Sequence, residues 1–248
     1  MSKNFNPCII IPVYRHGRAC AQVVEDIKGY NIPIILVDDG NEEETKSYLR
    51  QIKEKNPQVQ IVELKKNSGK GKAFKAGVIF AYKAGYTHAL QIDADGQHDS
   101  SRIPFFIEKS REEPEKMICG YPQYDESAPE HRKNAHKFAN TWCAIVTWSN
   151  KIKDSLCGFR VYPLKESYDF VTKSIFDSRM GFDVEILVRL MWRGVDVEFY
   201  PVKVTYPSDG ISNFHAFRDN VRISGVFSKL SSIMIIHTPL FLWRKLFK

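Results

Sequence analysis

Two aspartates follow an apolar segment near the middle of the chain. Residues 89–92 are predicted to form a buried strand, and Asp93, Asp95 and then Gly96 come directly after it. Carboxylates at the end of a strand suit a hard divalent cation, because Mg²⁺ and Mn²⁺ prefer oxygen ligands and leave positions open for substrate phosphates. Asp is also common in turns, so the alternative is a pair of helix-capping residues. We expect the pair to hold Mg²⁺ or Mn²⁺.

Polar clusters also follow other short apolar segments, where further strands are predicted to end. They are Pro12 and Tyr14 after residues 8–11, Asp38-Asp39-Gly40 after residues 34–37, and the glycine- and lysine-rich turn 67–73 after residues 59–64. The strands alternate with helical patterns such as residues 73–84. This order predicts an α/β fold with a parallel sheet and helices on both faces. Such sheets bind ligands at the carboxyl ends of their strands, where these clusters would meet.

Length and cysteine content limit the class of protein. The 248 residues, 43% of them hydrophobic, are sufficient for one α/β domain with a C-terminal extension. The five cysteines form no C-x-x-C pair, which argues against a zinc site or a disulfide framework and suits a reducing cytosol. The N-terminus lacks the apolar stretch of a secretory signal peptide. We therefore expect a cytoplasmic protein.

Basic, aromatic and apolar residues are concentrated in the last part of the chain, which contributes most of the net charge of +7. Its apolar runs, 233–236 and 240–243, are separated by His237 and Pro239 and fall short of the roughly 20 residues that a spanning helix needs. This composition is typical of helices that lie in the membrane interface. The alternative is a C-terminal helix docked on the core. We expect residues 224–248 to form an amphipathic tail that holds the protein peripherally on the inner face of the cell membrane.

Several classes of nucleotide- and nucleic-acid-binding protein fit the sequence poorly. Phe74 occupies the third glycine position of a dinucleotide-binding fingerprint, and Thr45 the second glycine position of a P-loop. A sugar nucleotidyltransferase should carry a glycine-rich loop with arginine after the first strand, where residues 13–17 contain a single glycine. The sequence pI of about 9.0 and the lysines of residues 65–75 would suit a nucleic-acid-binding module, but no recognition motif accompanies them. We expect no nucleic-acid partner.

Taken in order, the polar clusters resemble the motifs of the family 2 glycosyltransferases. The matching segments are Pro12-Val13-Tyr14, Val37-Asp38-Asp39-Gly40, Asn67-x-Gly69-Lys70-Gly71-x-Ala73 and Asp93-Ala94-Asp95-Gly96-Gln97-His98. Within the family the chain is most similar to the dolichol-phosphate (polyprenyl-phosphate) mannosyltransferases, through Asp154-Ser155-Leu156-Cys157-Gly158-Phe159-Arg160 and Phe182-Asp183-Val184-Glu185. The resemblance covers roughly residues 7–213. It implies a single-domain Rossmann-like nucleotide-sugar transferase fold and a metal-dependent, inverting transfer of sugar from a GDP- or UDP-sugar.

The resemblance implies a nucleotide-binding set. Pro12, Tyr14 and Asp39 would frame the nucleobase and ribose. Lys70 would add positive charge near the donor diphosphate, with Asp93 close by. A lysine at the start of a helix opposes the helix dipole, so a bound anion would help to explain its position. The alternative for the lysines of this turn is an exposed basic helix start.

The resemblance also implies a metal site. Asp93 and Asp95 would hold Mg²⁺ or Mn²⁺, and Gln97 would complete the set of protein ligands. The ion would bridge the donor diphosphate. It would neutralise the charge that develops on the leaving nucleoside diphosphate as the glycosidic bond breaks.

Three further residues are candidates on the acceptor side. Arg160 would bind an anionic group, such as an acceptor phosphate or the diphosphate, through its two-pronged guanidinium. Asp183 and Glu185 are the candidates for a general base or an acceptor-orienting group. They are two positions apart on a predicted helix and cannot face the same point. Asp183 is favoured if it precedes the helix, with Glu185 as an equal second candidate. A phosphate acceptor, already ionised, would need no base.

The segment after the last predicted strand departs from the mannosyltransferase pattern. Residues 206–213 resemble an R-x-x-G-x-S-K motif, but Pro207 replaces the arginine and Asn213 the lysine. Two phosphate-binding cations are therefore missing. This argues against a polyprenyl-phosphate acceptor. Residues 210–214 and 217–220 instead resemble a bacterial subgroup linked to lipid or envelope glycoconjugates, with a polyprenyl-phosphate mannosyltransferase proper as the alternative.

The expected organisation has two halves and a tail. Residues 1–115 would form the nucleotide-binding half and residues 116–223 the acceptor half of one glycosyltransferase domain, followed by the tail 224–248. Helices are expected at residues 131–151 and 180–193. The donor sugar, the acceptor and the oligomeric state stay open.

Overall fold

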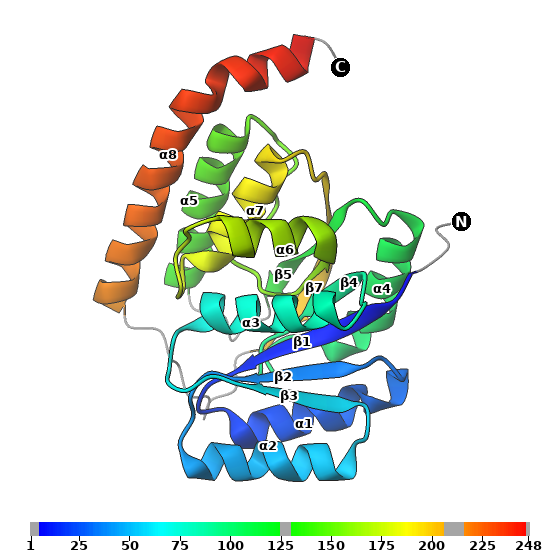
Figure 1. The fold of residues 1–248 in the computed structure, drawn as a ribbon. Coiled ribbons are helices and arrows are strands. Elements are labelled where there is room, and N and C mark those ends of the chain that lie inside the picture. Colours follow the sequence, from blue (N-terminus) through cyan, green and yellow to red (C-terminus); the bar gives the residue numbers. More distant parts are fainter. Residues whose placement is uncertain (1–4, 125–129, 206–215, 247–248) are drawn as a thin grey trace.

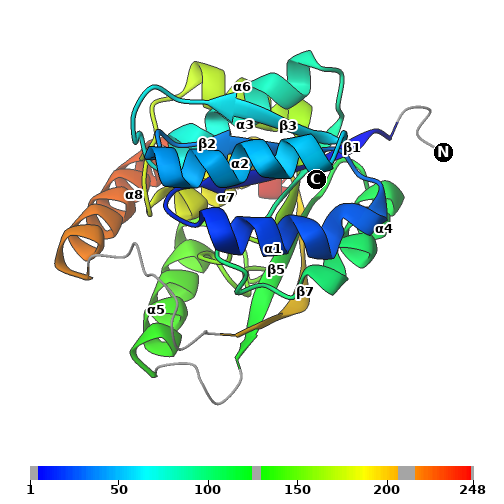
Figure 2. The same cartoon turned by 90° about the horizontal axis from the view of Figure 1, so that it is seen from below.

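The computed structural model describes the backbone of residues 5–124, 130–205 and 216–246, with side chains except at 130–135, 216–220, 237 and 240–246. A seven-stranded sheet carries helices on both faces (Figures 1 and 2). The strands are β1 (Pro7–Val13), β2 (Ile34–Asp38), β3 (Val59–Glu63), β4 (His88–Gln91), β5 (Met117–Tyr124), β6 (Arg160–Pro163) and β7 (Val197–Val204). The helices are α1 (Gly17–Ile27), α2 (Glu43–Lys55), α3 (Lys70–Lys83), α4 (Ile103–Glu112), α5 (Glu130–Thr147), α6 (Leu164–Lys173), α7 (Phe182–Trp192) and α8 (Ala216–Leu246), with short 3₁₀ turns η1 (Lys28–Tyr30) and η2 (Ser100–Arg102).

The strand order places a switch point at the centre of the sheet. Neighbouring strands follow the order β3-β2-β1-β4-β6-β5-β7. All pairs are parallel except those of β6, which is antiparallel to both β4 and β5. Because β1 pairs with β2 on one side and with β4 on the other, successive connections leave β1 in opposite directions. Ligand-binding crevices form at such points, outside the carboxyl ends of the strands.

The sheet separates two apolar layers, and alternate residues of β1 contribute to each. Ile9 and Ile11 are buried with side chains of α1, α2 and α4. Cys8 and Ile10 are buried with side chains of α3, α5, α6 and α7. Each large aliphatic side chain buried in this way contributes about 1.5–3 kcal/mol. Burial on both faces therefore fixes the strand ends from which the polar loops extend.

Helix α8 packs along α5 and then extends past it (Figure 1). Val226, Phe227 and Leu230 are buried in the layer that contains α5 and α7, and the Phe227 ring stacks on Trp142 with 4.4 Å between centroids. This part of the tail is docked on the core, which was the alternative to an interfacial segment. Residue 224, where the tail was expected to begin, lies inside α8, which starts at Ala216. No helix among the described residues has the length and apolar content needed to cross a membrane.

The predicted α/β fold, with a mostly parallel sheet flanked by helices, is confirmed. The strands expected at residues 34–37, 59–64 and 89–92 correspond to β2, β3 and β4. The helices expected at 131–151 and 180–193 correspond to α5 and α7, and α5 ends before Trp148, whose φ of +54° is incompatible with a continuing helix. The antiparallel strand β6 was not predicted.

Candidate active site

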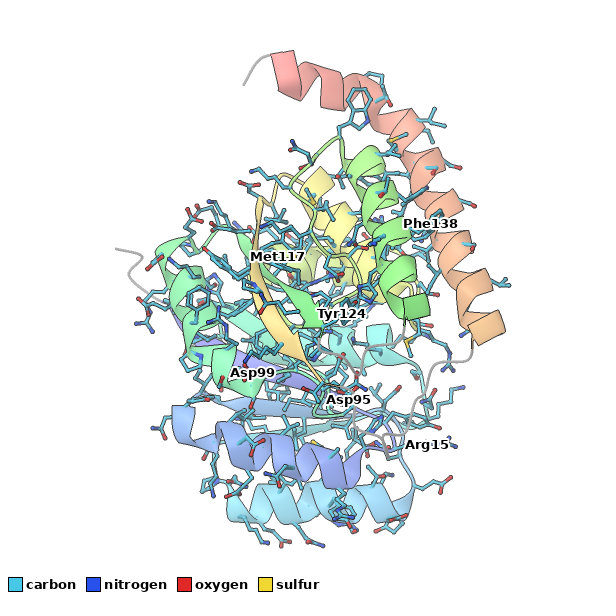
Figure 3. The ribbon with its side chains drawn as sticks, turned by 180° about the vertical axis from the view of Figure 1, so that it is seen from behind. Arg15, Asp95, Asp99, Met117, Tyr124 and Phe138 are labelled. Carbon is cyan, nitrogen blue, oxygen red and sulfur yellow. The ribbon has the colours of Figure 1, made fainter. Side chains whose placement is uncertain are left out.

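Loops from the centre of the sheet meet the start of α3 at the carboxyl edge. Figure 3 shows Arg15 and Asp95 in the loops after β1 and β4, which are parallel neighbours. The turn that enters α3 passes through Gly69, which has a φ of +93°. A Cβ there would lie 2.3 Å from the Ser178 carbonyl oxygen, so only glycine fits. This turn brings Lys70, the first residue of α3, beside the loop after β4.

Lys70 joins two carboxylates that are far apart in the sequence. Its Nζ lies 2.8 and 3.1 Å from the two carboxylate oxygens of Asp93 and 2.9 Å from Oδ2 of Asp183. Gln91 donates to the other Asp183 oxygen at 3.2 Å. Burial favours the neutral amine, but the charges of Asp183 and Asp93 raise the pKa of Lys70. Burial also opposes ionisation of Asp93, yet the Lys70 ammonium lowers the pKa of this carboxyl. We call these three charged residues the ion cluster.

A glycine lies directly over the ion cluster. A Cβ added to Gly158 would lie 2.7 Å from Nζ of Lys70 and 2.9 Å from Oδ2 of Asp93. The turn that carries Gly158 is held by Asp154, whose Oδ1 accepts from the N–H groups of residues 156 and 157 at 2.9 and 2.6 Å. Oδ2 of Asp154 lies 2.5 Å from Nδ1 of His136 on α5. The turn therefore covers the cluster without filling it.

Arg160 begins β6 and is fully buried. Its Nη1 donates to the carbonyl oxygen of Asp183 at 2.7 Å, and its Nη2 donates to that of Ser155 at 2.8 Å. The guanidinium thus connects the start of α7 to the turn over the ion cluster, which is a positioning role. The expected contact with an anionic acceptor group stays a prediction, because in this structure both prongs bind backbone carbonyls.

The two acids at the start of α7 point to different neighbours. Asp183 is the second residue of α7, so it does not precede the helix as its favoured role required, and its Oδ2 pairs with Lys70 in the ion cluster. Glu185 is fully buried, and its Oε1 accepts from Arg189 at 2.9 Å and from Lys229 of α8 at 2.7 Å. Its Oε2 accepts from the N–H of Asp177 at 2.8 Å. The expectation that the two carboxylates cannot face one point agrees with this geometry, which places Asp183 alone beside Lys70.

Asp39 holds the turn that leads into α3. Its oxygens accept from the N–H groups of Ser68 and Gly69 at 2.7 and 2.8 Å, and from the Asn67 amide at 3.3 Å. Burial raises the pKa of Asp39, and the two backbone N–H groups oppose this shift. Pro12 and Asp39 lie at the ends of the neighbouring strands β1 and β2. Contact of either residue with a nucleobase stays a prediction.

Asn41 connects the ends of β1 and β2, a role that sequence reasoning missed. Its Nδ2 donates to the Val13 carbonyl at 2.8 Å and to Oδ1 of Asp38 at 2.6 Å. Its Oδ1 accepts from the N–H of Arg15 at 2.7 Å. These bonds fix the turn in which the partly exposed Tyr14 lies, with the Arg15 guanidinium 5.2 Å from its ring centroid. Asparagine is common in turns, so its presence gave no specific signal.

The predicted metal site offers two carboxylates as ligands, those of Asp93 and Asp95. Asp93 pairs with Lys70, whereas the partly exposed Asp95 accepts from the N–H of Gln97 at 3.0 Å. Among the described residues, no three His, Cys, Asp or Glu side chains come together as a metal site. This oxygen set fits Mg²⁺ or Mn²⁺ only as an ion that takes further ligands from substrate phosphates and water. Residues 206–213, with the departures at Pro207 and Asn213, lie outside the described residues.

Known sequences and one family profile match most of the chain. The profile of "Glycosyl transferase family 2" matches residues 8–175. An uncharacterized protein of Methanocaldococcus jannaschii is 26% identical, over 82% of this chain and 90% of that protein. A dolichyl-phosphate beta-glucosyltransferase of Dictyostelium discoideum is 28% identical over 66% of this chain. The match covers 51% of that enzyme, so this chain spans about half of its length. The polyprenol monophosphomannose synthase of Mycolicibacterium smegmatis is 23% identical, over 82% of this chain and 79% of that enzyme.

Solved structures share the fold. Glucosyl-3-phosphoglycerate synthase from Mycobacterium tuberculosis, in complex with Mn²⁺, UDP-glucose and phosphoglyceric acid, matches with a TM-score of 0.67 at 12% identity, over 93% of this chain and 80% of that one. S. aureus TarS matches with a TM-score of 0.57 at 11% identity, over 81% of this chain and 60% of that one. At these identities the likeness establishes the fold. The family profile, which matches more than half of the chain, shows that this protein is a glycosyltransferase and belongs to family 2.

Proposed function

We propose that this glycosyltransferase moves a sugar from a nucleoside-diphosphate donor to a phosphate group on a lipid acceptor, with Mg²⁺ or Mn²⁺ as cofactor. The observation that carries the proposal is the ion cluster beneath Gly158. It lies at the sheet edge where the loops after β1 and β4 meet the start of α3. A confined ammonium flanked by carboxylates suits a reaction in which phosphate charge develops and must be neutralised.

The donor would lie across the loops after β1 and β2, with its diphosphate toward the start of α3. Tyr14 and Asp39 would contact the nucleoside. Lys70 would contact the diphosphate, where the dipole of α3 also favours an anion. Asp95 and Asp93 would hold the divalent ion, which when bound would neutralise the leaving group. UDP-sugars are favoured over GDP-sugars because a protein of the same fold binds UDP-glucose.

The acceptor would approach from the side of Gly158 and Asp183. A lipid phosphate is favoured because relatives are named for dolichyl-phosphate and polyprenol substrates. Such an acceptor is already ionised at neutral pH and needs no general base. Asp183 would then hold Lys70 in place rather than remove a proton. A hydroxyl acceptor would need a base, and Asp183 is the carboxylate of α7 that belongs to the ion cluster.

Exposed apolar side chains on two adjacent helices support a membrane location. Phe138 is 63% exposed and Ile145 is 61% exposed, seven positions apart on one face of α5. Phe138 also lies next to α8, with its ring centroid 5.8 Å from that of Phe227 (Figure 3). On α8, Ile235 and Ile236 are 67% and 75% exposed. We infer that this face contacts the inner surface of the cell membrane, where a lipid acceptor would be found.

A donor and acceptor panel tests the proposal. The full chain would be incubated with Mn²⁺ and UDP-glucose, UDP-N-acetylglucosamine or GDP-mannose, each with a polyprenyl phosphate or the corresponding polyprenol. We expect one donor class to transfer its sugar to the polyprenyl phosphate, with one nucleoside diphosphate released per sugar. Transfer to the polyprenol alone would replace the phosphate acceptor with a hydroxyl. No transfer to either lipid would refute a lipid acceptor.

A further inference from the structure

A pocket lies away from the ion cluster, between α8 and the segment that leads into α7. Its volume is about 250 Å³, and its lining residues are Phe176, Asp177, Glu185, Arg222, Gly225, Val226 and Lys229. The four residues from α8 are spaced by three and four positions, so they form one stripe that faces the body of the protein. Pockets for drug-sized ligands measure roughly 300–1,000 Å³, so this pocket suits a more compact group.

One cation in this pocket has a buried donor without an acceptor. Nη1 of Arg222 is inaccessible to water and has no hydrogen-bond partner among the residues that the structure describes. The carboxylates of the pocket are engaged elsewhere: Glu185 binds Arg189 and Lys229, and Oδ2 of Asp177 accepts from two N–H groups of the turn before α7 at 2.9 and 3.0 Å. A buried donor left without a partner costs about 1–3 kcal/mol, so it calls for an explanation.

The charge balance indicates what would satisfy this donor. Among the described side chains, Arg222 and Lys229 of the pocket and the adjacent Arg189 are three cations, against the two carboxylates of Asp177 and Glu185, which leaves one positive charge in excess. A guanidinium binds phosphate through paired N–H donors better than any other side chain. Gly225 keeps the wall open, because a Cβ added there would meet no atom within 4 Å.

We propose that this pocket is a phosphate site, in which Arg222 binds the terminal oxygens of a phosphate monoester or of inorganic phosphate. Two sources share this chemistry, a lipid headgroup that carries a phosphate monoester and free phosphate in solution. The site is distinct from the ion cluster, but one short segment links the two. Asp177 lines the pocket, and the carbonyl of the next residue, Ser178, accepts from the N–H of Gly71 in α3 at 2.9 Å. The proposal concerns binding and does not depend on the transfer reaction.

Phosphate titrations of the full chain test the proposal directly. Sodium phosphate would be compared with sodium chloride at equal ionic strength, by calorimetry and by thermal unfolding. The variant is Arg222→Gln, and the matched control is Arg50→Gln, an exposed arginine on α2 that pairs with Glu43. Unfolding of Arg222→Gln in sodium chloride alone shows how far the substitution itself changes stability, and the substitution removes a buried donor that has no partner among the described residues. Phosphate bound near Lys70 contributes equally to all three proteins, so the difference in phosphate affinity between wild type and Arg222→Gln reports on the pocket alone.

We expect Arg222→Gln to bind phosphate at least tenfold more weakly than wild type and to lose the phosphate-dependent rise in the unfolding temperature, with Arg50→Gln unchanged. A second arm uses phosphatidylcholine vesicles with phosphatidic acid, a monoester, or with phosphatidylglycerol, a diester. A preference for phosphatidic acid that disappears in Arg222→Gln would assign the site to a lipid headgroup. A phosphate effect without this preference would assign it to free phosphate. Equal phosphate affinity of Arg222→Gln and wild type would overturn the proposal.

Discussion

Replacing Gly158 by alanine would test the geometry of the ion cluster with a single methyl group. The added Cβ would lie 2.7 Å from Nζ of Lys70, about 0.7 Å short of the 3.4 Å at which ordinary contact begins. It would also lie 2.9 and 3.1 Å from the two oxygens of Asp93. All three atoms are ends of side chains rather than backbone, so the ion pair can move aside. The perturbation is therefore a displacement of the cluster by somewhat under 1 Å, with the fold preserved.

A displacement of this size has a calculable consequence for catalysis. A misplacement of about 1 Å at a reacting centre can lower turnover roughly 100-fold. A factor of 100 corresponds to about 2.7 kcal/mol in the activation free energy. We expect Gly158→Ala to lose roughly this much kcat for sugar transfer, with a change of less than about 1 kcal/mol in the free energy of unfolding.

The assay measures steady-state transfer and urea unfolding on the same protein preparations. Gly29→Ala is the control, because a Cβ at Gly29 would meet no atom within 4 Å. This control should keep wild-type turnover and stability. The reasoning is refuted if Gly158→Ala retains the wild-type kcat, or if its loss of activity is matched by a loss of folded protein.

Four further variants test other parts of the account. Asp95→Asn should lower transfer roughly 100-fold or more without unfolding the protein, because in the proposed mechanism its charge would hold the cation; full turnover in Mn²⁺-replete buffer would contradict this. Asp39→Ala should weaken binding of nucleoside diphosphates in calorimetry, and unchanged affinity would argue against its role. Arg160→Lys should lower the free energy of unfolding in urea by about 1–3 kcal/mol, because lysine cannot bridge both carbonyls. Deleting residues 240–248 should reduce sedimentation with anionic vesicles at low salt while the remaining chain stays folded; equal sedimentation would place the contact elsewhere.

The strand ends of this fold were predictable because strands buried on both faces appear as short apolar runs. The first polar residue after such a run marks the edge where a ligand can bind. Asp38 and Asp93 are the first polar residues after two such runs, whereas Asp39 was singled out by the family resemblance, and Asp39 and Asp93 lie at that edge. The alternation of these runs with helical patterns was enough to predict a parallel sheet with helices on both faces.

The partners of these residues could not be predicted in the same way. Lys70 meets Asp183 only because β4 and the start of α7 lie next to the start of α3, and no local pattern shows this. Strand β6 has four residues, which is too short for its periodicity to distinguish it from a loop. From the sequence, Arg160 could equally well bind an anion at the surface or, when buried, hydrogen-bond to backbone carbonyls. Its burial is decided by the antiparallel insertion of β6 between β4 and β5.

The central claim is that the ion cluster carries sugar transfer to a lipid phosphate. Its most direct test compares wild type with Asp93→Asn, which keeps the size of the side chain and removes its charge, using labelled donor sugar, Mn²⁺ and polyprenyl phosphate. We predict that labelled sugar appears in the lipid fraction with wild type, and at least 100-fold more slowly with an equal amount of folded variant. Equal rates of lipid labelling by the two proteins would contradict the account.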